Sequence, residues 1–148
     1  MKILLSLILY FNFATLFADE TYKFRIIVRG ETETISYPDG SRFQNVKLEG
    51  GFTDSIGNYG DVSGSGIREV DGNNILINTN VLFVIQSNDG SKFWAKAKRS
   101  QSDDKVGGKG NLIITAATGK FKELKNKVCD YAVLITDKFT VIQDHSCK

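Results

Sequence analysis

The feature that most constrains the fold of this chain is a series of short β-type runs separated by turn residues. Isoleucine, valine, phenylalanine and tyrosine recur throughout, and the chain contains 14 glycines but one proline. These residue types favour strands, and runs at this spacing are typical of an all-β barrel or sandwich. We expect strands over eight segments: Tyr22–Val28, Phe43–Ile56, Asp61–Val70, Ile75–Gln86, Lys92–Arg99, Gly110–Ala116, Val128–Thr136 and Phe139–Cys147.

Turn signals fill the gaps, and they favour neighbours in sequence pairing as neighbours in space. Tyr37-Pro38-Asp39-Gly40 and Asn88-Asp89-Gly90 predict tight turns, whereas Thr118–Lys127 is the one stretch where a helical turn is expected. Eight sequential antiparallel strands can close on themselves, with room inside for side chains or one small ligand. The predicted fold is therefore all-β, a single antiparallel eight-stranded barrel. A two-sheet sandwich is the competing architecture, because the strand count fits both.

The first 18 residues have the three-part layout of a secretory signal. A lysine at position 2 precedes the apolar stretch Ile3–Phe17, and the small residue Ala18 stands before two acidic residues. This stretch is shorter than the roughly 18–20 apolar residues of a spanning helix, although an uncleaved anchor is the alternative. We predict a signal peptide over 1–18, one β-barrel domain over 19–148, and a secreted or periplasmic location.

Two cysteines remain in the predicted mature domain, Cys129 and Cys147. An even cysteine count in an exported chain indicates a disulfide. If the loop of the last hairpin centres on Lys138, position 129 lies directly opposite position 147, and opposed residues of an antiparallel pair can be bridged. We therefore predict a disulfide within the C-terminal hairpin.

Charge and motif content argue against several function classes. Removal of residues 1–18 takes away one lysine and no acidic residue, which leaves 18 basic against 17 acidic residues and no excess for binding nucleic acid. His145 is the single histidine, so no His-based metal cluster and no cofactor are predicted. We expect His145 on the surface beside the disulfide, or alternatively as a partner of Tyr131. The chain also lacks the G-x-S-x-G element of serine hydrolases.

Strand alternation places a few polar residues on apolar faces. Asp54 shares the parity of Val46, Leu48, Phe52 and Ile56, unless a bend or bulge at Gly50-Gly51 shifts the register. Arg99 shares the parity of Phe93, and Tyr131 that of Cys129. A buried charge needs a partner, so Asp54 and Arg99 are a candidate pair inside the barrel, although both could instead reach water at strand ends. The candidate ligand-binding residues are Phe52, Asp54, Phe93, Arg99 and Tyr131.

The glycine pattern resembles the allene oxide cyclase and dirigent barrel group. The similar elements run in the order Gly57-Asn58-Tyr59-Gly60, Gly64-Ser65-Gly66, Gly107–Ile114 and Thr118-Gly119-Lys120-Phe121-Lys122. The resemblance implies an eight-stranded barrel with an apolar cavity. Plant members of the group guide the cyclisation of an epoxide or the coupling of radicals, largely by shape. None of their working residues aligns here, so the fold is carried over and the activity is not. The Thr118–Lys122 element also has a structural reading, in which Gly119 takes a positive φ and Phe121 plugs the core.

Three functions follow as hypotheses. The first is an exported barrel that binds a small apolar ligand or a partner protein, without evident catalysis. The second is a cyclase-like or dirigent-like enzyme in which Asp54 or Tyr131 assists proton movement, which requires both to face one cavity. The third is a structural, envelope-associated module whose contact face carries Trp94 among the lysines of the fifth strand.

Overall fold

The computed structural model describes residues 21–99, 102–103, 107–136 and 140–148. The predicted signal peptide, the Asp137-Lys138 turn and most of the polar loop that follows Arg99 lie outside these residues. No helix among the described ranges is long and apolar enough to cross a membrane.

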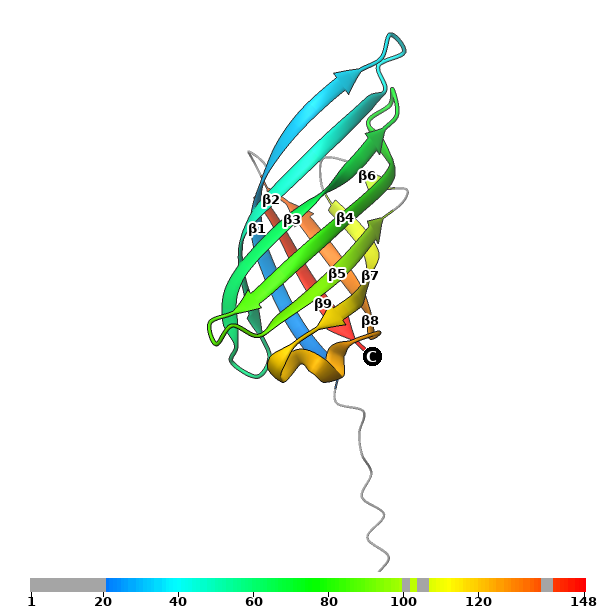
Figure 1. The fold of residues 1–148 in the computed structure, drawn as a ribbon. Coiled ribbons are helices and arrows are strands. Elements are labelled where there is room, and N and C mark those ends of the chain that lie inside the picture. Colours follow the sequence, from blue (N-terminus) through cyan, green and yellow to red (C-terminus); the bar gives the residue numbers. More distant parts are fainter. Residues whose placement is uncertain (1–20, 100–101, 104–106, 137–139) are drawn as a thin grey trace, which may run out of the picture.

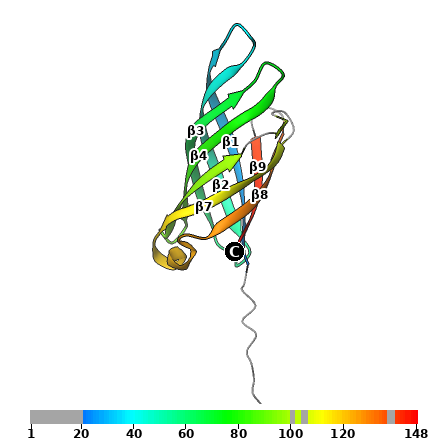
Figure 2. The same cartoon turned by 90° about the vertical axis from the view of Figure 1, so that its right-hand side faces the viewer.

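Eight long antiparallel strands form one sheet that closes into a barrel (Figures 1 and 2). The order around the barrel is β3-β2-β1-β9-β8-β7-β5-β4, and pairing of β3 with β4 closes it. The barrel prediction is therefore confirmed over the sandwich. The strands are β1 (Tyr22–Ser36), β2 (Arg42–Asp54), β3 (Tyr59–Val70), β4 (Ile75–Ser87), β5 (Lys92–Arg99), β7 (Gly107–Ala117), β8 (Val128–Ile135) and β9 (Thr140–Cys147), with the two-residue β6 (Ser102–Asp103) beside β4.

Two details of the second strand differ from expectation. Ile56 is exposed, because β2 ends at Asp54 and the chain turns before position 56. No bulge forms at Gly50-Gly51, since the register with β1 and β3 runs through both residues without a shift. The strands instead approach closely there: a Cβ at Gly50 would lie 2.0 Å from the carbonyl oxygen of Ile27. The inward parity of Phe52 and Asp54 is therefore retained.

The two ends of the barrel are built differently. At one end the hairpins β1–β2 and β3–β4 project past the other strands, because β1 continues to Ser36 instead of ending at Val28 (Figure 1). The opposite end is covered by a 3-10 helix, η1 (Gly119–Leu124), which confirms the helical turn expected there. We call the first end the mouth and the second the base.

An aromatic cluster closes the base. Gly119 has a φ of +58°, and a Cβ there would lie 2.1 Å from the Oγ of Ser91. Both the backbone conformation and the lack of space for a side chain therefore favour glycine at this position. The turn directs Phe121 into the barrel, where the ring is 2% exposed and makes edge contacts with Phe52 and Phe93 at centroid distances of 6.3 and 5.1 Å. Such pairs add to the gain from burying the rings. The predicted plug role of Phe121 is confirmed.

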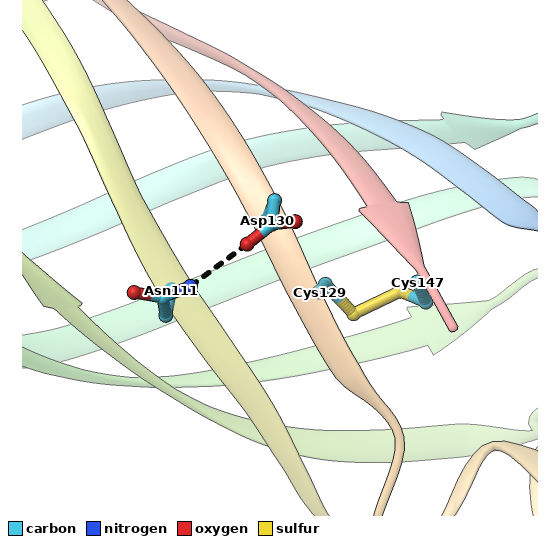
Figure 3. The surroundings of a disulfide bond; sticks show 4 residues. All are labelled: Asn111, Cys129, Asp130 and Cys147. Carbon is cyan, nitrogen blue, oxygen red and sulfur yellow. Dashed lines mark hydrogen bonds between the residues drawn. A yellow bond between two sulfur atoms is a disulfide. The ribbon is translucent and has the colours of Figure 1, made fainter.

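The disulfide Cys129–Cys147 joins β8 to β9, with the two cysteines directly opposite in the register (Figure 3). Both residues are fully buried, so the bond is part of the core. On the outer face beside it, the Asn111 side chain donates a 2.8 Å hydrogen bond to Asp130 and links β7 to β8. The bond fastens the last strand to the sheet, as predicted.

Removal of the disulfide should lower the free energy of unfolding by about 3 kcal/mol, the value for a loop of roughly this length. The bridged residues are 18 positions apart. We expect urea unfolding of the wild type to shift to lower concentration with dithiothreitol. The Cys129→Ala, Cys147→Ala double variant should match the reduced wild type and show no response to the reductant. Equal stability of oxidised and reduced wild type would contradict the prediction.

Truncation of the Phe121 side chain, which plugs the base, should destabilise the fold. We expect Phe121→Ala to lower the free energy of unfolding by about 3–5 kcal/mol, because a cavity replaces a buried ring. Lys122 is exposed in the same short helix, so Lys122→Ala should change stability by less than about 0.5 kcal/mol. Urea unfolding of the two variants beside wild type makes the comparison, and similar losses in both would show that Phe121 is not the plug.

Candidate functional site

A cavity of about 70 Å³ lies inside the barrel toward the mouth. Its apolar walls come from residues of four strands, β2, β4, β8 and β9: Val46, Leu48, Val81, Val133, Ile135 and Val141. Its polar lining comprises Thr32, Arg68, Thr79, Arg99, Tyr131 and Gln143, and Gly30 of β1 also lines it. Among the described residues that line it, none is an aspartate or a glutamate.

Strand register explains why the polar side chains gather at this level. Gln44, Arg68, Thr79 and Arg99 are direct neighbours across β2, β3, β4 and β5. The row two residues deeper is apolar or small, and runs through Val46, Gly66, Val81 and Ala97. Because the interval is two residues, both rows point into the barrel. The lining of the barrel therefore changes from apolar and small side chains to polar and basic ones over two positions along each strand.

Arg99 is the most deeply buried charge in this row. Its side chain is 7% exposed, and its Nε finds no hydrogen-bond partner within the described part of the chain. Burial lowers the pKa of Arg99, an effect that the neighbouring Tyr131 partly offsets. Burial lowers the pKa of Arg68 to about 10, and the positive charges of Arg99 and Arg42 add to the decrease. Two guanidinium groups thus line the cavity.

Tyr131 reaches the cavity from β8. Its ring passes over Gly110 of β7, where a Cβ would lie 2.4 Å from the phenol oxygen, so glycine at this position makes room for the ring. The hydroxyl donates a 3.3 Å hydrogen bond to the carbonyl of Lys98. Burial raises the pKa of Tyr131 to about 12, with a smaller opposing effect from Arg99. The phenol is therefore protonated at neutral pH and can donate a hydrogen bond.

His145 lies inside the barrel, and the expectation of a surface position was wrong. Its side chain is 3% exposed, because it shares the inward parity of Gln143 and Cys147 on β9. The imidazole stacks on Phe24 at a centroid distance of 4.3 Å and packs beside Tyr131 at 5.2 Å, so the alternative placement is confirmed. Neither ring nitrogen has a hydrogen-bond partner among the residues described. Burial lowers the pKa of His145 to about 3, so the ring is neutral.

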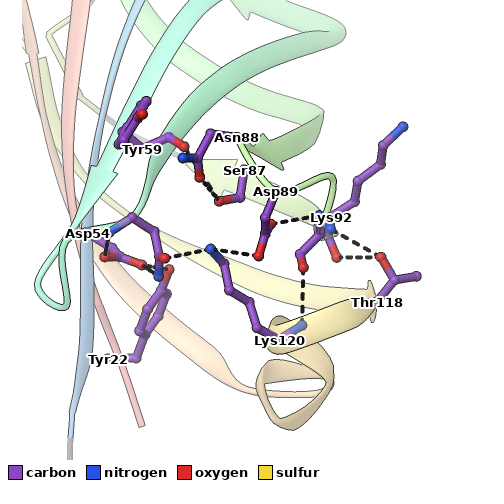
Figure 4. Close-up of polar contacts among 11 residues, drawn as sticks. Tyr22, Asp54, Tyr59, Ser87, Asn88, Asp89, Lys92, Thr118 and Lys120 are labelled. Carbon is purple, nitrogen blue, oxygen red and sulfur yellow. Dashed lines mark hydrogen bonds and ion pairs between the residues drawn. The ribbon is translucent and has the colours of Figure 1, made fainter.

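Asp54 and Arg99 do not form a pair. Asp54 ends β2 at the base, where it accepts hydrogen bonds from the Tyr22 hydroxyl at 2.9 Å and the Asn58 amide at 2.6 Å (Figure 4). Lys120 extends this network by donating to Asn58 at 2.6 Å and pairing with Asp89 at 3.0 Å. Asp54 thus links the start of β1 to the turn between β2 and β3 at the base. Because Asp54 does not line the cavity, it and Tyr131 do not face one open site.

Of the five predicted ligand-binding residues, two line the cavity, namely Arg99 and Tyr131. Phe52 and Phe93 belong to the aromatic core. Sequence reasoning missed Arg68 and left Gln143 out of the site. Both could have been found from parity: Arg68 matches Val62 and Val70 on β3, and Gln143 matches Cys147 on β9.

A wider groove, of about 790 Å³, lies over β4, β5, β7, β8 and β9, and Arg99 and Tyr131 line it as well as the cavity. Its lining carries three basic side chains, Lys98, Arg99 and Lys109, and two acidic ones, Asp130 and Asp144. Asn111 bonds to Asp130, and Asp144 accepts two hydrogen bonds from Arg25 at 2.6 and 3.0 Å. An exposed ion pair such as Arg25–Asp144 contributes little to stability. The interior cavity is the stronger candidate site because apolar side chains inside the barrel make up much of its lining, whereas most residues of the groove are polar or charged.

The cavity chemistry suits an anion. Guanidinium groups repel cations and donate hydrogen bonds to oxyanions. Across the described ranges, no group of three or more histidine, cysteine, aspartate or glutamate side chains is placed to hold a metal ion.

Solved structures share this fold at low sequence identity. An enzyme from Penicillium herquei superposes with a TM-score of 0.65 at 11% identity, covering 87% of this chain and 92% of that one. A conserved protein of unknown function from Rhodopseudomonas palustris gives 0.67 at 13% identity, covering 86% and 96%. A β-barrel-like protein from Acinetobacter baumannii gives 0.66 at 13% identity, covering 86% and 92%. These similarities establish the barrel fold alone. No protein-family model matches the sequence, and no curated protein is similar to it in sequence.

Acidification should lower the free energy of unfolding, because His145 is protonated more readily in the unfolded chain than in the folded one. An exposed histidine titrates near pH 6.5, whereas the pKa of His145 is about 3 in the folded chain. Between these values the unfolded chain takes up a proton that the folded chain does not, so the contribution to stability is complete above pH 6.5 and falls as pH falls. The slope from one such group is about 1.4 kcal/mol per pH unit.

Urea unfolding at pH 7, 6, 5 and 4 checks this for the wild type beside His145→Phe. The variant keeps an aromatic ring and every carboxylate, so the difference between the two proteins isolates the histidine. We expect wild type to lose stability relative to the variant as pH falls. A difference that does not change with pH would be inconsistent with a buried neutral imidazole.

Proposed function

We propose that this chain is an exported barrel protein that binds a small, largely apolar molecule in the cavity at its mouth. The observation that carries the proposal is the asymmetry of the interior. The base is filled by packed aromatic rings, whereas the mouth end has an unfilled, valine-rich cavity next to buried polar groups. Packed interiors leave few voids larger than a water molecule, so a space of this kind is a candidate ligand site.

The size of the cavity limits what it can hold. A void needs roughly 10–15 Å³ for each group of the size of a water molecule. A volume of about 70 Å³ therefore accepts on the order of five to seven such groups. Typical sites for drug-sized ligands are several times larger, at about 300–1,000 Å³. We infer a ligand with a short apolar segment inside the barrel and any larger part at the mouth.

Export and family membership belong to the same proposal. A buried disulfide is compatible with an oxidising compartment, which supports the signal peptide proposed for residues 1–18. The Thr118–Lys122 element resembles the one in the allene oxide cyclase and dirigent group, and here it forms the base plug. That placement supports a distant relationship to those barrels.

Binding is favoured over catalysis by the position of the acid–base groups. A proton-transfer role in the cavity would fall to Tyr131 alone, because Asp54 lies at the base. The raised pKa of Tyr131 makes its phenolate a minor species, so the group suits hydrogen-bond donation better than proton abstraction.

Native mass spectrometry beside the denatured mass tests for a bound molecule in protein purified from its secretory compartment. We expect extra mass that is lost on denaturation. Hexanol is the defined probe, followed by ¹H–¹⁵N NMR, with shifts concentrated at residues that line the cavity.

A matched pair of variants locates the site. Val81 lines the cavity, whereas its neighbour Leu82 is half exposed on the outer face. Val81→Phe should fill the void and weaken hexanol binding at least tenfold, and Leu82→Phe should leave it unchanged. A bare native mass together with no hexanol shifts in the wild type would refute the proposed function.

A further inference from the structure

We propose that one outer face of the barrel docks on the surface of an anionic phospholipid bilayer. The face lies over β4, β5 and β7, which are side by side in the sheet (Figure 1). We call it the lysine–tryptophan face, and its outward side chains are Leu82, Val84, Lys92, Trp94, Lys96, Lys98 and Ile113. The face is on the outside of the barrel, so the inference is independent of the cavity and of the ligand proposed for it.

The charge of this face has one sign. The described strands β4, β5 and β7 contain no aspartate or glutamate, although the chain has 17 acidic residues in all. Lys92, Lys96 and Lys98 alternate on β5 with buried residues, so all three project outward. Within the described part of the chain, none of these lysines forms an ion pair. Their charge is therefore available to an external anion.

Apolar side chains lie among these lysines. Leu82, Lys96, Ile113 and Val128 are direct neighbours across β4, β5, β7 and β8. The three apolar members of this row are 50%, 47% and 49% exposed. Trp94 lies in the adjacent row and is partly exposed. Exposed apolar side chains that cluster and are bordered by charges mark an interaction surface.

An anionic bilayer matches both features. Lysine ammonium groups are attracted to its phosphates, while their apolar stems lie along the surface. Tryptophan is enriched at the level of the lipid headgroups, because one part of its ring system is apolar and its N–H stays wet. Leu82 and Ile113 would enter the same layer. A soluble polyanion would pair with the lysines but leave these apolar groups in water, so the combination favours a lipid surface.

The surroundings define the extent of the positive region. Toward the base, Lys122 of η1 and Lys125 directly after it are exposed, and η1 packs against β5 and β7. Acidic residues lie at the borders, on the flanking strands β3 and β8, on β6 beside the mouth end of β4, and in η1: Asp61, Asp130, Asp103 and Glu123. The positive region therefore covers one side of the barrel and its base, and ends before the mouth.

Trp94 is the single tryptophan of the chain, so its fluorescence reports from within the face. The protein purified from its secretory compartment is titrated with vesicles of phosphatidylcholine alone, and with vesicles that also contain phosphatidylglycerol. We expect the emission of Trp94 to shift to shorter wavelength with the anionic vesicles, and the affinity for them to be at least about tenfold higher. Added salt should weaken this binding, because it screens the lysines.

A matched pair of double variants locates the contact. Lys96→Glu, Lys98→Glu reverses two charges of the face, and should weaken binding to the anionic vesicles at least about tenfold. Lys23→Glu, Arg29→Glu reverses two exposed charges on β1, on the opposite side of the closed sheet, and should change binding less than about twofold. Leu82→Ser removes an exposed apolar group without a change of charge, and should also weaken binding.

Three outcomes would overturn the inference: no binding to the anionic vesicles, equal affinity for both kinds of vesicle, or equal losses in the two double variants. Binding of polyglutamate without a response to vesicles would also overturn it, and would assign the lysines to a soluble acidic partner. If Lys96→Glu, Lys98→Glu does not fold, the wild-type vesicle comparison and Leu82→Ser still decide. None of these results bears on the cavity, which the hexanol experiments test separately.

Discussion

Closure of the sheet through the β3–β4 pairing is the constraint on which the rest of the structure depends. Once the barrel closes, each strand has one face inside and one face in water, and the interior volume is fixed by the number of strands. Every inward side chain must then share that volume. The glycines of β3 show the consequence, because a Cβ at Gly64 would lie 2.8 Å from the ring of Phe83 on the neighbouring strand. Small residues on one strand accommodate large ones on the next.

The interior is filled unevenly. At the base, the rings of Phe24, Phe52, Phe93 and Phe121 meet at edge-to-face angles and leave no space for a guest. Outside these rings, the network from Tyr22 through Asp54 to Lys120 satisfies the polar groups of the rim. Toward the mouth, the filling changes to valines and then to arginines, and a void remains. Base and mouth therefore differ in packing, because aromatic rings fill the base and the void lies toward the mouth.

Buried polar atoms toward the mouth lower the stability of the barrel where they lack hydrogen-bond partners. The Nε of Arg99 and the Oε1 of Gln143 have no hydrogen-bond partner among the described residues, and a core made of apolar residues would be at least as stable. His145, by contrast, is kept neutral between Phe24 and Tyr131 and does not line the cavity. Its position links the stability of the barrel to pH, separately from ligand binding.

The sequence by itself determined the sequential antiparallel strands, the disulfide between the opposed positions 129 and 147, and the plug at Phe121, whereas the β3–β4 pairing decided for a barrel over a sandwich. These features depend on local alternation, turn chemistry and hairpin register, all of which act between neighbours in the chain. Only the tertiary structure decided which inward polar residues meet. Asp54 and Arg99 are each the last residue of a strand, and both lie on its inward face. They are at opposite ends of the barrel because β2 runs toward the base and β5 runs toward the mouth. Arg68 joins Arg99 through an intervening strand, and His145 is buried by β1 and β8, which come from distant parts of the chain. Such proximity depends on the shear of the closed sheet, which alternation within a strand does not specify.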